Sequence, residues 1–248
     1  MTATWDTIAD WYAELLRTGS PLNDFNRDAL LAHLPDRLHG LRVLDLGCGE
    51  GLITRALAAR GATALGIDPT ARLIDHARTT ATPGPGSAVY TVDDGCVLGT
   101  VADRSVDWVT AGLSLNHVPD LDAALTAARR VLKPGGRLVL SLPHPCFEAP
   151  HASWTQSADG AVRRVVGAYL AEGFRRSDDP GAVRRAGYRH RTLSTCLTAL
   201  LRSGFAPEAV DEPAPPAPVV ARSPRRAGLP PFLLIRARAP HDPPGSAG

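Results

Sequence analysis

Three glycines that alternate with single residues constrain the fold of this chain more than any other feature. Residues 43–51 read VLDLGCGEG, so an apolar, strand-like run leads directly into Gly47, Gly49 and Gly51. Glycine is needed in such a turn because the backbone takes positive φ and lies close to a ligand. Residues 52–59 then carry apolar residues at helical spacing. The pattern predicts a strand, a tight turn and a helix whose first amides, with their partial positive charge, face a ligand.

A carboxylate follows at the end of the next strand-like segment. Residues 63–68 read TALGID and end in Asp68. In a doubly wound sheet, an acid at the tip of the second strand holds ribose hydroxyls, because one carboxylate can accept from both. A glycine turn with an acid about 20 residues further on therefore indicates a nucleoside-containing ligand.

The spacing of the glycines narrows the ligand further. A dinucleotide-binding turn reads G-x-G-x-x-G, whereas the sequence from Gly47 reads G-x-G-x-G. Asp45 lies inside the end of the first strand, where it can bind an ammonium directly or through water. A ligand with an amino-acid portion and no pyrophosphate suits this arrangement, which disfavours an NAD-dependent oxidoreductase. The alternative is a strand–helix turn that binds nothing.

The string D-x-G-x-G-x-G on a strand, followed by Asp68, resembles motif I of the class I S-adenosylmethionine-dependent methyltransferases of small-molecule type. Two further segments resemble the same family. Residues 106–111 read VDWVTA, a strand with an acid near its start, and residues 131–141 read VLKPGGRLVLS, a helix–PGG–strand segment. The resemblance covers residues 40–142 firmly and the terminal strands loosely.

The resemblance implies an α/β fold. This is a doubly wound, seven-stranded, mostly parallel sheet with an antiparallel C-terminal strand, the Rossmann-like methyltransferase fold. It also implies N-terminal lid helices within residues 1–38 and a substrate cap, residues 143–191, inserted after the fifth strand. We expect one methyltransferase domain over residues 1–238 and a disordered tail over residues 239–248.

The expected elements follow from apolar periodicity and from helix stop signals such as Pro134-Gly135-Gly136. We expect helices at residues 5–16, 24–34, 51–60, 71–80, 121–132 and 193–202. We expect strands at residues 41–46, 63–68, 89–92, 106–111, 137–142, 205–210 and 232–238. Between residues 148 and 190 the periodicity is weak and confined to residues 162–170.

The resemblance places the cofactor contacts at the ends of the parallel strands. The residues that match are Asp45, Gly47, Cys48, Gly49, Asp68, Pro69, Asp94, Gly95 and Leu113. Asp94 aligns better than Asp93 with an acid that hydrogen-bonds the adenine amino group, and the alternative for this pair is turn chemistry. Tyr12, on the lid, is predicted to touch the cofactor or the substrate, or else to pack between two helices.

Three histidines are candidates for a general base. If the acceptor is a phenol, a hydroxyl or an amine, a base helps to remove its proton, and histidine is partly neutral at working pH. His144 follows the fifth strand, His190 precedes a helix that borders the cap, and His117 occupies a position where the family very often has histidine. Each taken singly fits a structural or surface role better than catalysis, and we expect at least one to face the substrate.

Arginine pairs in and beside the cap offer a second chemistry. Residues 163–164, 175–176 and 184–185 are each Arg-Arg. Guanidinium groups bind carboxylate or phosphate bidentately, so these pairs are candidates for holding an anionic group of the substrate. The alternative, which the sequence favours, is a solvated surface.

The predicted function is methyl transfer from S-adenosylmethionine to a small-molecule acceptor of secondary metabolism, with O-methylation favoured over N- or C-methylation. One alternative is an S-adenosylmethionine-binding enzyme of this fold that runs a non-methylating reaction such as cyclisation or decarboxylation. Another is a cofactor-sensing protein without activity, against which the intact glycine turn and acids argue.

Composition excludes several other classes. The net charge of +2 and the absence of an N-P-P-Y-like tetrapeptide after residue 111 disfavour nucleic-acid substrates. The four cysteines have no metal-ligand spacing, so we expect no metal and a reduced, cytoplasmic protein. No signal peptide and no apolar run of about 18–20 residues is present, so we expect no membrane association. We expect a monomer or a homodimer.

Overall fold

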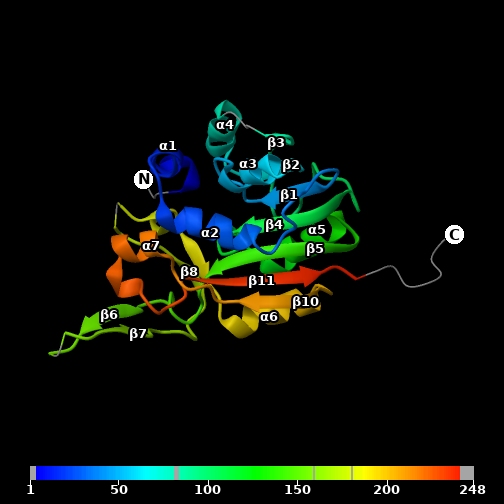
Figure 1. The fold of residues 1–248 in the computed structure, drawn as a ribbon. Coiled ribbons are helices and arrows are strands. Elements are labelled where there is room, and N and C mark those ends of the chain that lie inside the picture. The colour runs from blue at the N-terminus through cyan, green and yellow to red at the C-terminus, as the bar shows by residue number, and fades with distance from the viewer. Residues whose placement is uncertain (1–3, 81–83, 159, 180, 241–248) are drawn as a thin grey trace.

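The computed structural model describes residues 4–80, 84–158, 160–179 and 181–240, and its centre is a seven-stranded sheet (Figure 1). The strand order is β10-β11-β5-β4-β1-β2-β3. The strands are β1 (Arg42–Leu46), β2 (Thr63–Asp68), β3 (Ser87–Val92), β4 (Val106–Gly112), β5 (Leu132–Pro143), β10 (Ala206–Asp211) and β11 (Phe232–Arg238). β11 runs antiparallel to both of its neighbours, and β1 to β5 are parallel. The predicted doubly wound sheet with an antiparallel C-terminal strand is confirmed.

Helices connect and cover the strands. They are α1 (Trp5–Arg17), α2 (Pro21–Leu31), α3 (Leu52–Ala59), α4 (Ala71–Thr79), α5 (Leu121–Val131), α6 (Leu193–Arg202) and α7 (Ala217–Arg222), with short 3-10 helices η1 (Val183–Ala186) and η2 (Pro224–Arg226). Local capping fixes where two of them begin. The Asp120 carboxylate accepts from the amide of Ala123 at the start of α5, and the Thr192 hydroxyl does the same for Thr195 in α6.

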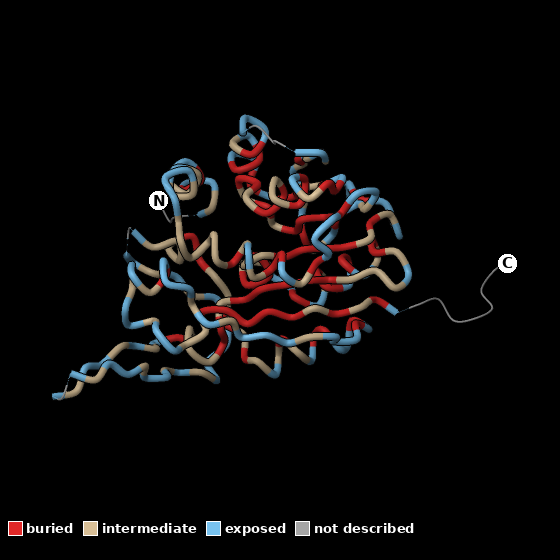
Figure 2. The backbone as a smooth tube through the Cα atoms, viewed as in Figure 1, coloured by how far each residue is buried: buried red, intermediate tan, exposed pale blue. Residues whose placement is uncertain are grey.

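Both faces of the sheet are buried, as expected for parallel strands with helices on each side (Figure 2). Successive side chains of β1 point to opposite faces of the sheet and so belong to two different apolar layers. Val43 packs with α2 and α3, whereas Leu44 and Leu46 pack with α5 and α6 on the opposite face. Burying one such leucine contributes about 1.5–3 kcal/mol, so the two apolar layers hold the carboxyl ends of the strands in place.

Two boundaries differ from the prediction for identifiable reasons. The second helix, expected at 24–34, occupies Pro21–Leu31, because Pro21 starts a helix readily at its first position. The fifth strand, expected to begin at Arg137, already pairs at Leu132 with Val106. The register then shifts, and Gly135 has a φ of +72°, so the PGG segment forms an irregularity inside the strand.

The segment after β5 forms two small antiparallel pairs. β6 (Ser153–Gln156) pairs with β7 (Val162–Val165), and β8 (Gly173–Arg175) pairs with β9 (Tyr188–His190). The β6–β7 hairpin projects from the body of the molecule, below α7 (Figure 1).

The ordered chain continues past the predicted start of the tail. Ala239 is buried, and its amide donates to the carbonyl of Gly136. Residue 239 of the predicted tail thus packs against β5, residues 241–248 lie outside the described residues, and the predicted tail stays a prediction. Within the described part of the chain, no helix has the length and apolar character needed to cross a bilayer.

Candidate active site

The glycine turn after β1 has the backbone conformation that its sequence predicts. Gly47, Gly49 and Gly51 have φ values of +73°, +56° and +92°. A Cβ atom on Gly47 would lie 2.4 Å from the Cβ of Ser114, so no side chain fits there. The amides of Gly47 and Cys48 both donate to the carbonyl of Ile67 at 2.8 Å. The turn is therefore fixed to the end of β2 by backbone contacts.

Asp68, at the end of β2, is held by two backbone amides. One carboxylate oxygen accepts from Gly49 at 3.0 Å and the other from Thr70 at 2.9 Å. Burial raises the pKa of this carboxyl group above its usual value, and the amide hydrogen bonds oppose that rise. A carboxylate has about four lone-pair sites, so sites remain for two ribose hydroxyls.

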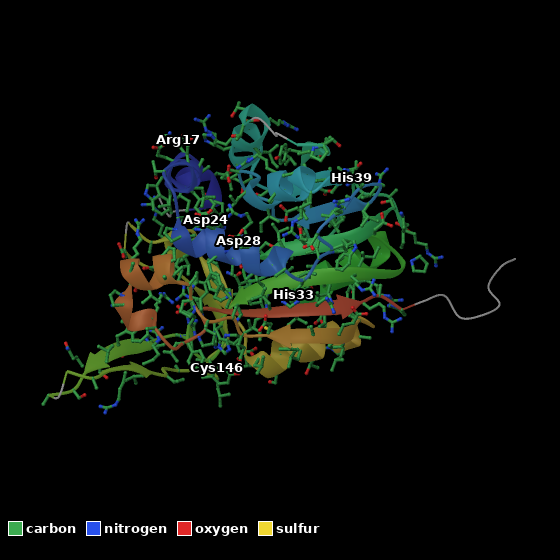
Figure 3. The ribbon with its side chains drawn as sticks, viewed as in Figure 1. Arg17, Asp24, Asp28, His33, His39 and Cys146 are labelled. Carbon is green, nitrogen blue, oxygen red and sulfur yellow. The ribbon has the colours of Figure 1, made fainter. Side chains whose placement is uncertain are left out.

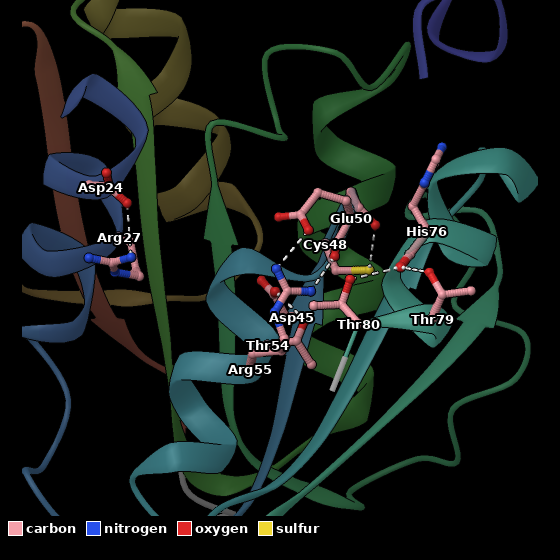
Figure 4. Close-up of polar contacts among 11 residues, drawn as sticks. Asp24, Arg27, Asp45, Cys48, Glu50, Thr54, Arg55, His76, Thr79 and Thr80 are labelled. Carbon is pink, nitrogen blue, oxygen red and sulfur yellow. Dashed lines mark hydrogen bonds and ion pairs between the residues drawn. The ribbon is translucent and has the colours of Figure 1, made fainter. Parts of the chain in front are cut away.

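Asp45 lies behind the turn (Figure 4). Its oxygens accept from the hydroxyls of Thr54 at 2.6 Å and Thr110 at 3.0 Å, and the side chain does not line the cavity described below. Burial raises the pKa of Asp45 to about 6. Asp45 thus supports the turn from beneath by linking α3 and β4. The two threonines were missed from the sequence, although a hydroxyl three residues after Gly51 on the helix facing Asp45 was a usable signal.

A cavity of about 520 Å³ opens at the carboxyl ends of the parallel strands. Its volume is typical of sites for cofactors and drug-sized ligands. Nine of the ten predicted cofactor residues line it, and Asp45 does not. The nine are Gly47, Cys48, Gly49, Asp68, Pro69, Asp94, Gly95, Leu113 and Tyr12. The structure therefore brings together residues from four strand ends and the N-terminal helix.

The two acids after β3 have different surroundings. The carboxylate of Asp93 accepts from the amides of Asp94, Gly99 and Thr100 and from the Thr100 hydroxyl. It builds the turn, whereas Asp94 lines the cavity. Asp94 also takes part in the turn, because its Oδ1 atom accepts from the amide of Cys96 at 2.8 Å. Turn chemistry therefore applies to both acids, and the adenine contact of Asp94 stays a prediction.

Backbone strain occurs where β4 meets the cavity. Leu113 has a φ of +54°, which is uncommon for a residue that is not glycine. Its amide donates to the backbone and hydroxyl oxygens of Ser141, both at 3.1 Å. Such strain persists where surrounding contacts fix the backbone, and it concentrates at ligand sites.

The N-terminal helix closes one side of the cavity. Trp5 and Tyr12 line it, and their rings meet edge to face at a centroid distance of 5.2 Å. Burial, with the nearby carboxylates of Glu50 and Asp68, raises the pKa of Tyr12 well above its usual value. On the outer side, Arg17 of α1 is exposed (Figure 3), and Asp24 of α2 is half-buried and pairs with Arg27.

His117 is the predicted histidine that lines the large cavity. Its Nδ1–H donates to the carbonyl of Gly187 at 2.8 Å, so Nε2 is the acceptor for the Asn116 amide group at 3.0 Å. Burial lowers the pKa of His117 to about 4. Trp5 packs edge-on against the imidazole at 5.0 Å between centroids.

The other two histidines lie elsewhere. His144 is buried, contacts Glu212 at 2.5 Å through Nε2 and accepts from the amide of Cys146 through Nδ1. His190 is buried, donates from Nε2 to the carbonyl of Tyr169 at 2.7 Å and lines a small cavity of about 30 Å³, which shares Glu148 and Arg184 with the large one. Neither lines the large cavity.

Two asparagines in the cavity wall were not singled out from the sequence. Asn26 of α2 and Asn116 after β4 are 3% and 9% exposed, and the Oδ1 atom of each is buried without a hydrogen-bond donor in the described ranges. A polar residue on an otherwise apolar face of α2 was the only available signal for Asn26. Buried polar atoms are usually paired, so these two oxygens indicate a ligand that brings donors.

The fold and the site define a Rossmann-like, nucleoside-binding α/β domain, with its ligand at the carboxyl ends of the strands. Comparison with known proteins narrows this class. A family model described as a methyltransferase domain matches residues 44–140. The crystal structure of an S-adenosylmethionine-dependent methyltransferase from Mesorhizobium loti is 33% identical with a TM-score of 0.72, and the match covers 89% of this chain and 99% of that one.

Two other similar proteins match different shares of the chain. A ubiquinone biosynthesis O-methyltransferase from Xanthomonas oryzae pv. oryzae is 39% identical over 120 residues, which is 48% of this chain and 49% of that protein. The chain therefore spans about half the length of the curated relatives it matches. The cyclase SpnF shares the fold at 17% identity and a TM-score of 0.63, over 97% of this chain and 98% of that one.

This chain belongs to the class I S-adenosylmethionine-dependent methyltransferases, whose cofactor is S-adenosylmethionine. The residues present fit that cofactor. Asp68 retains acceptor sites for ribose hydroxyls, Asp94 faces the cavity at the next strand end, and Gly49 leaves the turn open toward Tyr12, 3.8 Å from where a Cβ would be.

Proposed function

We propose that this protein is an O-methyltransferase that acts on a hydroxyl group of a small molecule, a secondary metabolite. The observation that carries the proposal is the pair of buried amide oxygens, Asn26 Oδ1 and Asn116 Oδ1, in the cavity wall. A buried acceptor without a donor costs about 1–3 kcal/mol, so these atoms favour an acceptor molecule that carries donor hydrogens. Hydroxyl and amino groups carry such hydrogens, whereas a carbon nucleophile does not.

The orientation of Asn116 follows from its neighbours. Because the carbonyl of Gly187 can only accept, His117 must carry its proton on Nδ1. Nε2 of the imidazole then needs a donor, and the Nδ2 group of Asn116 provides it. Oδ1 of Asn116 is therefore the atom left for a ligand. We assign His117 the role of a positioning residue for Asn116.

When bound, S-adenosylmethionine supplies an electrophilic methyl group. The side chains have to hold the acceptor oxygen in line with that group and exclude water. Alignment of this kind is worth about 7–11 kcal/mol. Asn116 Oδ1 accepts a hydrogen bond from the substrate hydroxyl and thereby directs an oxygen lone pair. The hydroxyl proton, replaced by methyl, is released to solvent.

Two observations support oxygen as the acceptor atom and methylation as the reaction. The curated relatives with 39% identity carry O-methyltransferase in their names. The likeness to the cyclase, at 17% identity, concerns the fold alone and therefore gives no argument for cyclisation.

The test supplies S-adenosylmethionine labelled as CD3 together with 3,4-dihydroxybenzoate and related phenols, and locates the label by mass spectrometry. We expect the CD3 group on a phenol oxygen. In Asn116→Leu, we expect kcat/KM to fall about 5- to 150-fold, because the buried substrate hydroxyl loses its acceptor at a cost of about 1–3 kcal/mol, with the Kd for S-adenosylhomocysteine unchanged.

Asp68→Asn serves as the matched control, because it weakens S-adenosylhomocysteine binding at the other end of the cavity. A label on nitrogen or carbon, or an unlabelled isomer of the substrate, contradicts the proposal. So does an Asn116→Leu protein with wild-type kcat/KM.

A further inference from the structure

Three guanidinium groups surround one carboxylate at the cap end of the cavity. Glu148, which follows β5, forms ion pairs with Arg184 at 2.8 Å, Arg226 at 3.0 Å and Arg164 at 3.8 Å. The Glu148 side chain is 12% exposed. One negative and three positive charges leave an excess of two positive charges in this cluster, in which the side chains of Arg164, Arg226 and Arg184 are 10%, 26% and 35% exposed. Such an excess attracts an anion, because partly buried charges of one sign repel one another unless an opposite charge pairs with them.

The three arginines are not equivalent. Arg164 is committed to the cap: it donates from Nε and Nη2 to the carbonyl of Phe147 and lies over the ring of Trp154, 4.8 Å from the centroid. Its side chain does not line the large cavity. Its role is to hold the β6–β7 hairpin against the segment that carries Glu148.

Arg184 and Arg226 line the cavity together with Glu148. Each donates a hydrogen bond to Glu148 from one nitrogen, Nη2 of Arg184 and Nη1 of Arg226. Arg184 also lies over the ring of Tyr188 at 4.7 Å, which leaves its in-plane N–H groups free of that contact. A guanidinium has five N–H donors, so each arginine keeps donors for a ligand.

The pair is preorganised. Arg184 belongs to η1 and Arg226 to η2, and Glu148 bridges them from a third segment. Its Oε2 atom accepts from Arg184 and its Oε1 atom accepts from Arg226. The flexible side chains are therefore fixed before a ligand arrives, which lowers the entropy lost on binding. Asn116 lines the same cavity, so a hydroxyl and an anionic group on one small molecule have partners within it.

We propose that Arg184 and Arg226 form a subsite for a carboxylate group of the methyl acceptor, so that the substrate is a hydroxylated organic acid. This inference rests on the O-methyltransferase function proposed above. A carboxylate is favoured over a phosphate because Glu148 stands between the two arginines and repels a dianion more strongly than a monoanion. Guanidinium groups bind a carboxylate with two parallel hydrogen bonds.

The test measures binding and turnover separately. For binding, 3,4-dihydroxybenzoate or its neutral counterpart, 3,4-dihydroxybenzamide, is titrated into the full chain saturated with S-adenosylhomocysteine, and the Kd of each compound is measured. We expect the wild type to bind the acid at least about tenfold more tightly than the amide, the effect of one charge-assisted hydrogen bond. Arg184→Gln and Arg226→Gln should each remove most of that preference and leave the Kd for S-adenosylhomocysteine unchanged.

Arg202→Gln is the matched control. Arg202 also pairs with a carboxylate, Asp122 at 2.8 Å, but on the exposed surface of α6, so its loss should not alter the preference. In turnover, we expect the Arg184 and Arg226 variants to raise KM for the acid with little change in kcat.

Each remaining result overturns a specific claim. Equal binding of acid and amide by the wild type, or an unchanged preference in Arg184→Gln and Arg226→Gln, overturns the carboxylate subsite. Tighter binding of phenyl phosphate than of benzoate would show that the subsite prefers phosphate, which overturns its assignment to a carboxylate. A normal acid preference with no CD3 transfer to oxygen leaves the subsite standing and removes the proposed O-methylation instead.

Discussion

The two ends of the cavity differ in whether backbone or side-chain atoms define their shape. At the proposed cofactor end, which Gly47, Cys48, Gly49 and Asp68 line, backbone atoms set the shape. The amides of Gly47 and Cys48 donate to the carbonyl of Ile67, and the amides of Gly49 and Thr70 donate to Asp68. At the opposite end, around Glu148, side chains set the shape, since Glu148 pairs with arginines from three separate segments.

The difference determines how each end responds to mutation. A backbone-built end is insensitive to most side-chain changes, because the amides remain whatever residue carries them. It is sensitive where positive φ and close packing exclude a Cβ atom. A side-chain-built end can change its specificity by single substitutions while the sheet stays intact. Variants should therefore separate cofactor binding from substrate selection.

The largest effect is expected from Gly47→Ala. The new Cβ would lie 2.4 Å from the Ser114 Cβ, and an L-residue at a φ of +73° adds about 1–2 kcal/mol of strain. Ser114 cannot move freely, because its hydroxyl donates to the carbonyl of Leu46 at 2.6 Å. We expect the Kd for S-adenosylhomocysteine, measured by isothermal titration, to rise by roughly 100-fold, equivalent to about 2.7 kcal/mol.

Gly160→Ala is the control for that experiment. Gly160 has a φ of +83° in the turn of the β6–β7 hairpin, and a Cβ atom added there would meet nothing within 4 Å. It carries the same backbone strain without the clash, and its Kd should match the wild type. Equal affinities of the Gly47 and Gly160 variants would show that the cofactor end is not built as described.

A smaller effect is expected on the pH dependence of stability. It depends on His117, which donates a hydrogen bond to the carbonyl of Gly187 and so joins the two ends of the cavity. The pKa of His117 is about 4 when folded, against an ordinary value of 6.5, because burial disfavours the charged ring. As the pH falls, His117 is therefore protonated in the unfolded chain at a higher pH than in the folded one. Stability contributed by His117 is present above pH 6.5 and is lost as the pH falls toward 4, by roughly 3 kcal/mol at most.

The measurement is Tm between pH 8 and pH 4 for the wild type and for His117→Gln. Asp45, with a pKa of about 6 when folded, acts in the opposite direction, since its protonation favours the folded state. Both proteins contain Asp45, so the difference between their curves isolates His117. We expect the wild type to lose more Tm on acidification, and parallel curves would refute a buried neutral imidazole.

The smallest effect is expected at the outer edge of the N-terminal helix. Asp10 of α1 accepts from Arg72 at 2.8 and 3.0 Å and contacts His76 at 2.6 Å, which ties α1 to α4. These groups are exposed, and exposed ion pairs contribute little. Asp10→Asn should speed release of S-adenosylhomocysteine in stopped-flow by a few-fold at most.

Glu14→Gln provides the comparison on the same helix, because Glu14 pairs with Arg17 within α1. It should leave the release rate unchanged. A release rate that rises equally in both variants would mean that the α1–α4 contact does not hold the helix over the cavity.

The amino-acid sequence was sufficient for the framework of this protein. Alternating glycines required positive φ, apolar periods marked the strands and helices, and Asp68 and Asp94 could be placed because carboxyl ends of parallel strands meet at one edge. These signals are local: each depends on φ/ψ preference or on which face of an element is apolar. Between β5 and α6 the only such signal is weak periodicity over residues 162–170, so the two antiparallel strand pairs there could not be placed from the sequence.

Tertiary structure alone decided which groups share a site. It placed Asp45 behind the turn against Thr54 and Thr110, oriented Asn116 through His117, and left His144 and His190 outside the large cavity. It also brought Glu148 to Arg184 and Arg226, which are 36 and 78 residues further along the chain. Periodicity specifies which secondary structure a segment forms and which of its faces is buried. Contacts between irregular segments depend instead on the positions that the packed sheet and helices give to the ends of those segments.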